Sequence, residues 1–326
     1  MGPTASVRNL TGTYNMAEPK RQIDLTLGFP SFEKLFPPPA FGTYVYFEGG
    51  ERFPFEARAL MPSLINSWWL ADCSLLAYES PENIRAILRP LPFFIPDSFQ
   101  WFHSKGKRLQ ANTQAFLLES EQFALLAFRG TEFPGARTVL RRPGKILDCF
   151  ADMKTDLKLF PRPVLTGIPT FECAVHPGIA EALQTVWEPL MTALDAIGDK
   201  PLWITGHSLG GALATLLAYQ IPERVAGLVS FGSLPVGTEE FASSYAAKGL
   251  TAKTLRVVHG KDPAPNLFNL IRDDYQPVGQ LVCLDSREGR GAIGDWLRKA
   301  TTNTMNVDPV DHAPIFYAYE TWNAIN

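Results

Sequence analysis

Residues 203–214 read Trp203-Ile204-Thr205-Gly206-His207-Ser208-Leu209-Gly210-Gly211-Ala212-Leu213-Ala214. A short apolar run meets a Gly-x-Ser-x-Gly turn, and small helix-forming residues follow the turn. This order predicts a strand, a tight turn and a helix, with Ser208 exposed on the turn as a nucleophile. Gly206 and Gly210 permit a tight turn because they have no β-carbon. Close packing of small residues is the alternative interpretation of the glycines, but the flanking strand and helix patterns favour a nucleophile.

A nucleophilic serine needs a basic histidine and a carboxylate that orients this histidine. In an α/β-hydrolase the three groups follow one another in the order serine, acid, histidine, and the histidines beyond Ser208 are His259 and His312. Between Ser208 and His259 the chain has no aspartate, and its acidic residues there have the pattern of solvated charges: Glu223, Glu239 and Glu240. We therefore predict that His312 is the base.

Asp262 is the acid that the sequence favours. It lies in the loop at residues 260–265, directly after the β-branched, strand-like run 254–258, and chemistry gathers at the carboxyl ends of parallel strands. Asp273 and Asp274 have the pattern of an exposed turn, and Asp295 lies in a helical pattern. The remaining candidates between Ser208 and His312 are Asp285, Asp308 and Asp311.

Acyl transfer also needs N–H donors for the oxyanion that develops in the transition state. The N–H of Leu209, at the start of the predicted helix, is one donor. The second is expected where the apolar strand 122–128 ends at Arg129-Gly130-Thr131. There Thr131 would offer its backbone N–H and its hydroxyl, although an ordinary strand exit has the same pattern.

The other histidines are expected in supporting roles. His207 is predicted to pack or form a hydrogen bond beneath the turn, and His259 to form a structural hydrogen bond. His176 is predicted to brace a loop near the site, and His103 to lie in an aromatic loop at the surface or in packing.

On these motifs the chain resembles the class 3, or fungal-type, lipase family. The motifs that carry the resemblance are 128–131, 148–157 with Asp152, 175–178, 206–214, 257–265, and Asp311-His312 before a final helical segment. They extend over residues 66–326. The chain departs from the family in Pro177, where a small or polar residue is more usual, and in residues 1–60, which match no pattern.

The resemblance implies an α/β-hydrolase fold with a lid over the active site. It further implies a triad of Ser208, Asp262 and His312, and an oxyanion hole at Thr131 and Leu209. The implied reaction is hydrolysis of carboxylic esters, often of lipids, without a cofactor. We therefore expect a triacylglycerol lipase or esterase. Phospholipase, short-chain carboxylesterase and acyltransferase activities remain open, as does an inactive hydrolase fold that serves as a binding partner.

The alternation of predicted elements favours an α/β fold with a mostly parallel sheet and helices on both faces. A helical pattern begins near Asn66, a hairpin is expected over 113–128 and a helix over 179–197, and further strands are expected over 228–232 and 254–258. With 326 residues and 46% hydrophobic side chains, one large domain is expected. We assign residues 61–326 to this catalytic domain and residues 1–60 to an extension packed on it.

The net charge and the hydropathy of the chain limit the kinds of partner that it can bind. A formal net charge of −3 is too mild to suggest a nucleic-acid partner, and no apolar run is long enough to span a membrane. Contact with lipid would therefore be peripheral, at a lipid–water interface. Residues 1–24 are polar and do not have the pattern of a secretory signal. This predicts a cytoplasmic protein if the chain is complete, or a secreted one if a signal has been removed. The motifs do not specify an oligomeric state.

Two further features concern cysteines and the lid. The four cysteines, Cys73, Cys149, Cys173 and Cys283, lack C-x-x-C spacing and clustered histidines, which predicts no metal site and leaves disulfides and buried thiols equally open. Residues 133–147 are basic with an apolar face, and residues 291–300 form an amphipathic pattern around Trp296. Either segment is a candidate lid. A solvated loop and an ordinary core-docked helix are the respective alternatives.

Overall fold

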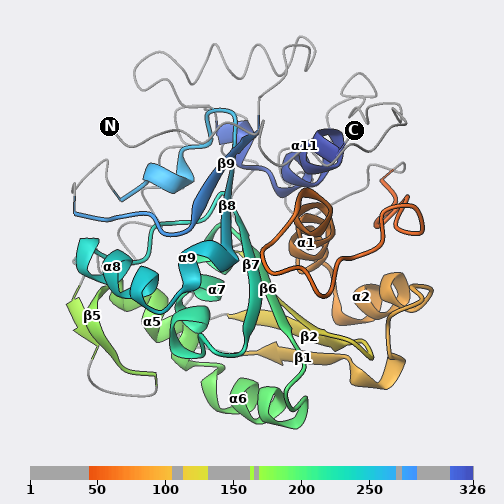
Figure 1. The fold of residues 1–326 in the computed structure, drawn as a ribbon, viewed down its shortest axis with the longest axis horizontal. Coiled ribbons are helices and arrows are strands. Elements are labelled where there is room, and N and C mark those ends of the chain that lie inside the picture. Colours follow the sequence, from red (N-terminus) through yellow and green to blue (C-terminus); the bar gives the residue numbers. More distant parts are fainter. Residues whose placement is uncertain are drawn as a thin grey trace.

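Seven strands form one sheet in the part of the chain that the computed structural model describes, residues 44–104, 113–130, 162–164, 169–268, 274–284 and 309–325. Their order across the sheet is β1-β2-β3-β6-β7-β8-β9 (Figure 1). The strands are β1 (Gln100–His103), β2 (Gln114–Glu119), β3 (Ala124–Phe128), β6 (Leu202–His207), β7 (Val225–Phe231), β8 (Thr254–His259) and β9 (Gln280–Leu284). β4 (Arg162–Val164) and β5 (Phe171–Val175) pair separately as a two-stranded ribbon.

The sheet is antiparallel at one edge and parallel elsewhere. β1, β2 and β3 pair antiparallel, and each strand from β3 to β9 pairs parallel with the next one in the sheet. The predicted hairpin over 113–128 is confirmed as β2 and β3. Because β6, β7 and β8 run parallel, their C-terminal ends lie side by side at the same end of the sheet.

Helices cover both faces of the sheet, as predicted for this fold class (Figure 1). On one face lie α1 (Leu64–Leu76) and α11 (Pro314–Ile325), which pack against each other and against β6 and β8 respectively. On the other face α7 (Leu209–Gln220) packs against β3, β6 and β7, and α5 (Pro177–Gln184) packs against α7. The remaining helices are α2 (Pro81–Leu88), α6 (Trp187–Ala196), α8 (Glu239–Ala247) and α9 (Leu250–Lys253). Short 3₁₀ helices occupy Pro96–Ser98, Ala264–Asn266 and Pro309–His312.

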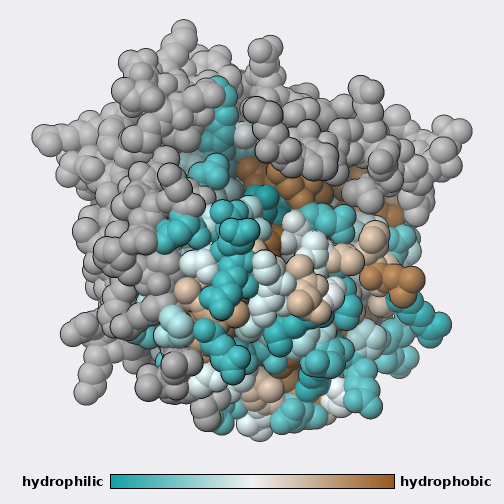
Figure 2. Space-filling model, turned by 60° about the vertical axis from the view of Figure 1, so that its left-hand side comes forward, coloured by the Kyte–Doolittle hydropathy of each residue, from teal (hydrophilic) through white to brown (hydrophobic). Residues whose placement is uncertain are grey.

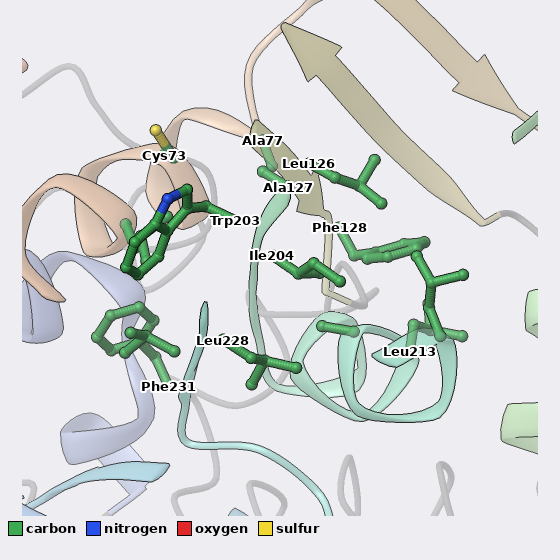
Figure 3. Close-up of a cluster of buried hydrophobic side chains, with 14 of the residues drawn as sticks. Cys73, Ala77, Leu126, Ala127, Phe128, Trp203, Ile204, Leu213, Leu228 and Phe231 are labelled. Atoms are coloured by element: carbon green, nitrogen blue, oxygen red, sulfur yellow. The ribbon is translucent and has the colours of Figure 1, made fainter. Parts of the chain in front are cut away.

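The core lies in two layers, one between each face of the sheet and its helices. Alternate residues of β6 point to opposite faces, so Trp203 points toward Cys73 of α1 while Ile204 points toward Leu213 of α7 (Figure 3). Gly227 of the neighbouring strand makes room for the indole, since a Cβ there would lie 2.7 Å from Cε3 of Trp203. Every residue of β3 and of β6 is buried, which explains why β3 is apolar along its whole length and does not alternate.

The single helix expected over 179–197 is wrong, because the structure has two helices there, α5 and α6, which are separated at Thr185 and Val186. Pro189 explains the break. Proline has no N–H to donate, and in a continuous helix its ring would clash with the carbonyl of Thr185, four residues earlier. As the third residue of a new helix, Pro189 causes neither problem.

Residues 44–57 pack against α1 and α11. The hydroxyl of Tyr44 and the backbone N–H of Phe47 both donate to the buried carboxylate of Asp72 in α1. The ring of Phe47 stacks on Trp69 with centroids 5.0 Å apart. These residues therefore share the core of the sheet and helices, while the division of the chain at residue 60 stays a prediction.

The described surface in Figure 2 is mainly hydrophilic, with hydrophobic side chains gathered toward its upper part. Among the described residues, the exposed large hydrophobic side chains are Val45, Leu60 and Met61. In this part of the chain no helix combines the length and the hydropathy that crossing a membrane requires.

Candidate active site

Ser208 occupies the turn between β6 and α7, with φ 58° and ψ −125°. This conformation is rare for a residue with a side chain. The turn is held because the N–H of Ser208 donates to the carbonyl of Phe231 at 2.9 Å. It can form because two glycines allow close approach: a Cβ on Gly206 would lie 2.7 Å from the nitrogen of Gly211, and one on Gly210 would lie 2.9 Å from the carbonyl carbon of Arg129.

Asp262 lies in the loop that follows β8, at the C-terminal end of the parallel strands, where Ser208 also lies. Its side chain is fully buried. One carboxylate oxygen, Oδ1, accepts the backbone N–H of Ala264 at 2.8 Å. The other, Oδ2, faces the imidazole of His312 and also accepts the hydroxyl of Tyr317 in α11.

His312 connects the acid to the serine. It ends the 3₁₀ helix that precedes α11, and its ring is fully buried. Nδ1 lies 2.9 Å from Oδ2 of Asp262, and Nε2 lies 2.9 Å from Oγ of Ser208. The structure thus brings together the three side chains that the sequence predicts as a triad. A carboxylate on Nδ1 fixes the proton there, so that Nε2 can accept the serine proton.

The ring of His207 lies next to the ring of His312, with centroids 4.5 Å apart. Its Nε2 donates to the backbone carbonyl of His312 at 2.7 Å, since a carbonyl can only accept. Burial, and secondarily the neighbouring His312, lowers the pKa of His207, so the ring stays neutral and its Nδ1 accepts. The donor to Nδ1 is the hydroxyl of Tyr78, 2.8 Å away, whose pKa is raised by burial. The predicted packing of His207 beneath the turn agrees with these contacts.

His259 and Asp311 form a second buried contact close to the first pair. Nδ1 of His259 lies 3.1 Å from the backbone oxygen of Asp311 and 3.7 Å from its Oδ1. The other carboxylate oxygen of Asp311 accepts the N–H of Lys261 at 2.7 Å. This contact fastens the segment that carries His312 to the loop that carries Asp262. It matches the structural role expected for His259.

The other candidate residues lie apart from these contacts. His176 caps the start of α5, where Nδ1 accepts the N–H of Ile179 at 3.4 Å, and its ring stacks on Phe268 with centroids 4.6 Å apart. Burial lowers the pKa of His176 to about 4. His103, expected in a loop, is an exposed residue of β1. The glutamates set aside from the sequence are exposed: Glu223, Glu239 and Glu240.

Of the two expected oxyanion donors, one can be located. Leu209 is the first residue of α7, and the first N–H groups of a helix have no partner within it. Thr131 lies outside the described residues. Gly130, which precedes it, lies against the turn, since a Cβ there would be 3.2 Å from Cβ of Ser208.

Several predicted features also lie outside the described residues: both lid candidates (133–147 with its basic residues, and 291–300 with Trp296), Asp152 and Cys149. Cys73, Cys173 and Cys283 are free thiols. Within the described ranges, no cluster of three or more histidine, cysteine or acidic side chains is arranged to hold a metal ion.

Tyr317 and Gly232 also contact the site, and neither was predicted from the sequence. Gly232 has φ +50°, and a Cβ there would press on Oδ2 of Asp262 and lie 3.0 Å from Nδ1 of His312. Tyr317 shares the same carboxylate oxygen. The available signal was positional: Gly232 directly follows the strand next to the serine turn, and Tyr317 lies in the helix directly after His312.

A mostly parallel sheet, a serine on a strained strand-to-helix turn and the order serine, acid, histidine together define an α/β-hydrolase. A family model described as Lipase (class 3) matches residues 125–271, a range that includes Ser208 and Asp262. Over these residues the chain is similar to the class 3 lipase family.

Individual relatives match shorter segments. Secreted mono- and diacylglycerol lipase 1 of Fusarium solani is 38% identical over 103 residues, which cover 29% of this chain and 30% of that protein. Phospholipase A(1) DAD1, chloroplastic, of Arabidopsis thaliana is 37% identical over 117 residues, covering 32% of this chain and 26% of that protein. The matched segments therefore span less than a third of the length of either relative.

A solved structure supports the fold. Nonglycosylated LIP2 lipase of Yarrowia lipolytica superposes with a TM-score of 0.52 and 19% identity, covering 68% of this chain and 79% of the other. At this identity the likeness concerns the fold and not the substrate.

Proposed function

We propose that the chain hydrolyses carboxylic esters of lipids through an acyl-serine intermediate, with Ser208, His312 and Asp262 as its catalytic triad. The observation that carries the proposal is the pair of 2.9 Å contacts that His312 makes, one to Oγ of Ser208 and one to Oδ2 of Asp262. The match of residues 125–271 to the class 3 lipase model supports lipid esters as the substrate class.

In the proposed first step Oγ of Ser208 attacks the ester carbonyl carbon while Nε2 of His312 takes the hydroxyl proton. Asp262 keeps the other imidazole proton on Nδ1 and stabilises the imidazolium that forms. The carbonyl oxygen becomes an oxyanion, for which the N–H groups of Leu209 and Thr131 are the proposed donors.

The tetrahedral intermediate then collapses. The bond to the alcohol oxygen breaks, His312 gives its proton to the leaving alkoxide, and an acyl-serine remains. A water molecule attacks this ester with His312 again acting as base, and a second collapse returns the proton to Oγ of Ser208 and releases the carboxylic acid.

A second candidate is phospholipase activity, because one relative is described as a phospholipase A(1). Both reactions use the same three residues and differ in the head group that the pocket admits. Short-chain ester hydrolysis and an inactive binding role are further alternatives. Two parts of the proposal stay predictions: action at a lipid–water interface beneath a lid, and location, cytoplasmic or, as described for one relative, secreted.

The test compares Ser208→Ala with Ser74→Ala, whose buried hydroxyl donates to the carbonyl of Ala71 and lies in α1. We expect Ser208→Ala to lose about 10⁶-fold in kcat, by analogy with other triads, and Ser74→Ala to keep its activity. Rates are measured on a triacylglycerol emulsion, on phosphatidylcholine vesicles and on soluble esters of graded chain length.

Preference for phosphatidylcholine over triacylglycerol would favour the phospholipase alternative. A Ser208→Ala variant that kept more than a few per cent of the activity, or a wild-type protein that no fluorophosphonate labels at Ser208, would contradict the proposed nucleophile.

A further inference from the structure

Tyr317 makes a contact that the hydrolysis mechanism above does not use. Its hydroxyl donates to Oδ2 of Asp262, the same oxygen that faces Nδ1 of His312. With the N–H of Ala264 on Oδ1, the carboxylate therefore accepts three hydrogen bonds, and two of them meet on one atom.

The direction of the Tyr317 hydrogen bond follows from its surroundings. The backbone N–H of His259 donates to the phenol oxygen at 3.2 Å, which leaves the phenol proton for the carboxylate. Burial, and next the nearby charge of Asp262, raises the pKa of Tyr317 well above its ordinary value. The phenol thus keeps its proton, and remains a donor, at any pH at which an ordinary tyrosine is protonated.

The titratable groups that face this contact come from four elements. His207 at the end of β6 lies with its ring 4.5 Å from that of His312 and 5.7 Å from that of Tyr317. His259 at the end of β8 lies 5.8 Å from the Tyr317 ring, and Asp311, in the 3₁₀ helix, lies beyond it. The fourth element, α1, ends just before Tyr78, which faces the far side of His207.

The space around the shared oxygen is closed to larger groups. A Cβ on Gly232 would contact Oδ2 of Asp262 and would lie 2.8 Å from the hydroxyl oxygen of Tyr317 and 3.0 Å from Nδ1 of His312. The three polar groups therefore meet beside Gly232, which has no side chain to displace them. This close packing holds the phenol of Tyr317 in a fixed position.

We infer that Tyr317 is a positioning residue whose hydroxyl holds the Asp262 carboxylate in place. The same hydroxyl weakens the electrostatic stabilisation that this carboxylate gives to the imidazolium form of His312. Tyr317 thereby sets the pH at which His312 can accept the serine proton. This inference rests on the proposed function. A donor on Oδ2 withdraws negative charge from the oxygen that His312 faces. Without this donor the carboxylate stabilises the imidazolium more strongly, and His312 keeps its second proton to higher pH.

The experiment replaces Tyr317 by phenylalanine, which keeps the ring and removes the hydroxyl. The matched control is Tyr245→Phe, because Tyr245 is equally buried. Its hydroxyl forms a hydrogen bond of 2.8 Å with the hydroxyl of Thr254. These residues of α8 and β8 take no part in the site. The full chain is assayed for kcat/KM on a soluble short-chain ester from pH 4.5 to 9. In parallel, the ring carbon Cε1 of His312 is followed by NMR as a function of pH.

We expect the acid limb of the Tyr317→Phe profile, and the NMR titration of His312, to move upward by roughly 0.5 to 1 pH unit. The control should leave both in place. If Tyr317→Phe does not fold, 3-fluorotyrosine at position 317 serves instead, because its more acidic phenol is a stronger donor and should move both curves downward.

Curves that do not move, or that move in the opposite direction, overturn the inference. The failure of the proposed function gives a different result: Ser208→Ala would then be as active as the wild type. A protein that needs Ser208 for activity, but whose profile is indifferent to Tyr317, contradicts the inference alone.

Discussion

Two buried contacts between a histidine and an aspartate lie close together in this protein, and they differ in what the imidazole connects. His312 joins the carboxylate of Asp262 to the hydroxyl of Ser208, with 2.9 Å on each side. His259 joins the end of β8 to the backbone of Asp311 at 3.1 Å, and its ring stacks on Phe316. Burial and a nearby carboxylate therefore do not identify an active site, since both pairs have them. The two pairs differ in the serine hydroxyl that the second nitrogen of His312 contacts.

Among the variants that test this comparison, the largest expected effect separates the two aspartates. Asp262→Asn places an amide beside Nδ1 of His312 and favours the wrong tautomer, so we expect a loss of about 10⁴-fold in kcat. Asp311→Asn keeps an oxygen for the N–H of Lys261 and leaves Asp262 in place. It should keep activity within about tenfold, equivalent to ~1.4 kcal/mol of activation free energy.

Both variants are assayed on a soluble ester, and their thermal unfolding is recorded to show that they fold. Equal losses of kcat would mean that the two pairs cannot be divided into a catalytic and a structural one.

A second variant pair tests how closely the contact between Asp262 and His312 is packed. Gly232→Ala would introduce a Cβ beside Asp262 and His312 at φ +50°, whereas Gly249→Ala introduces one at φ +73° with no atom within 4 Å. Both carry the cost of a left-handed backbone, so their difference reports on the packing. We expect about 10²-fold lower kcat for Gly232→Ala, since a displacement on the order of 1 Å has this effect, and unchanged kcat for Gly249→Ala. Similar kcat values for the two would argue against tight packing.

Two further histidines, His207 and His176, extend the comparison because they are buried beside neutral groups. Burial lowers the pKa of His207 well below the ordinary value and that of His176 to about 4. Because these folded-state pKa values are depressed, the unfolded chain binds more protons as the pH falls below ~6.5. Stability should therefore be greatest above pH ~6.5 and decline as the pH falls toward 4, each group contributing up to ~1.4 kcal/mol per pH unit.

The measurement is urea unfolding at several pH values between 4.5 and 7.5. His176→Asn keeps an oxygen that can cap α5 but cannot titrate, so it should show a slope lower by about one proton. An unchanged slope would mean that His176 does not remain neutral in the folded protein.

The sequence predicts the serine turn and the alternation of strands and helices because their constraints are local. A tight turn needs Gly206 and Gly210 on either side of Ser208, and buried strands need uninterrupted apolar runs. Asp262 and His312 follow from chain order and from the position of a loop after a strand. The structure places both side chains beside Ser208, and their catalytic roles stay predictions for the variants to test.

Tyr317 could not be predicted in the same way. Most residues of α11 are buried, and they include other aromatic side chains: Phe316, Tyr319 and Trp322. Only the packing of α11 against α1 and β8 decides which of these rings meets Asp262. The break between α5 and α6 was missed for a different reason. The apolar pattern continues through residues 179–197, and the one signal against a single helix is Pro189.

The backbone at Ser208 has a consequence for the evolution of this chain. A residue with a side chain at φ 58° and ψ −125° costs on the order of 1–3 kcal/mol, and glycine would relieve most of this strain. Selection for thermostability alone would therefore favour the loss of the hydroxyl that we propose as the nucleophile. Under the proposed function, serine at this position is a compromise in which the need for a nucleophile outweighs the conformational preference of the backbone.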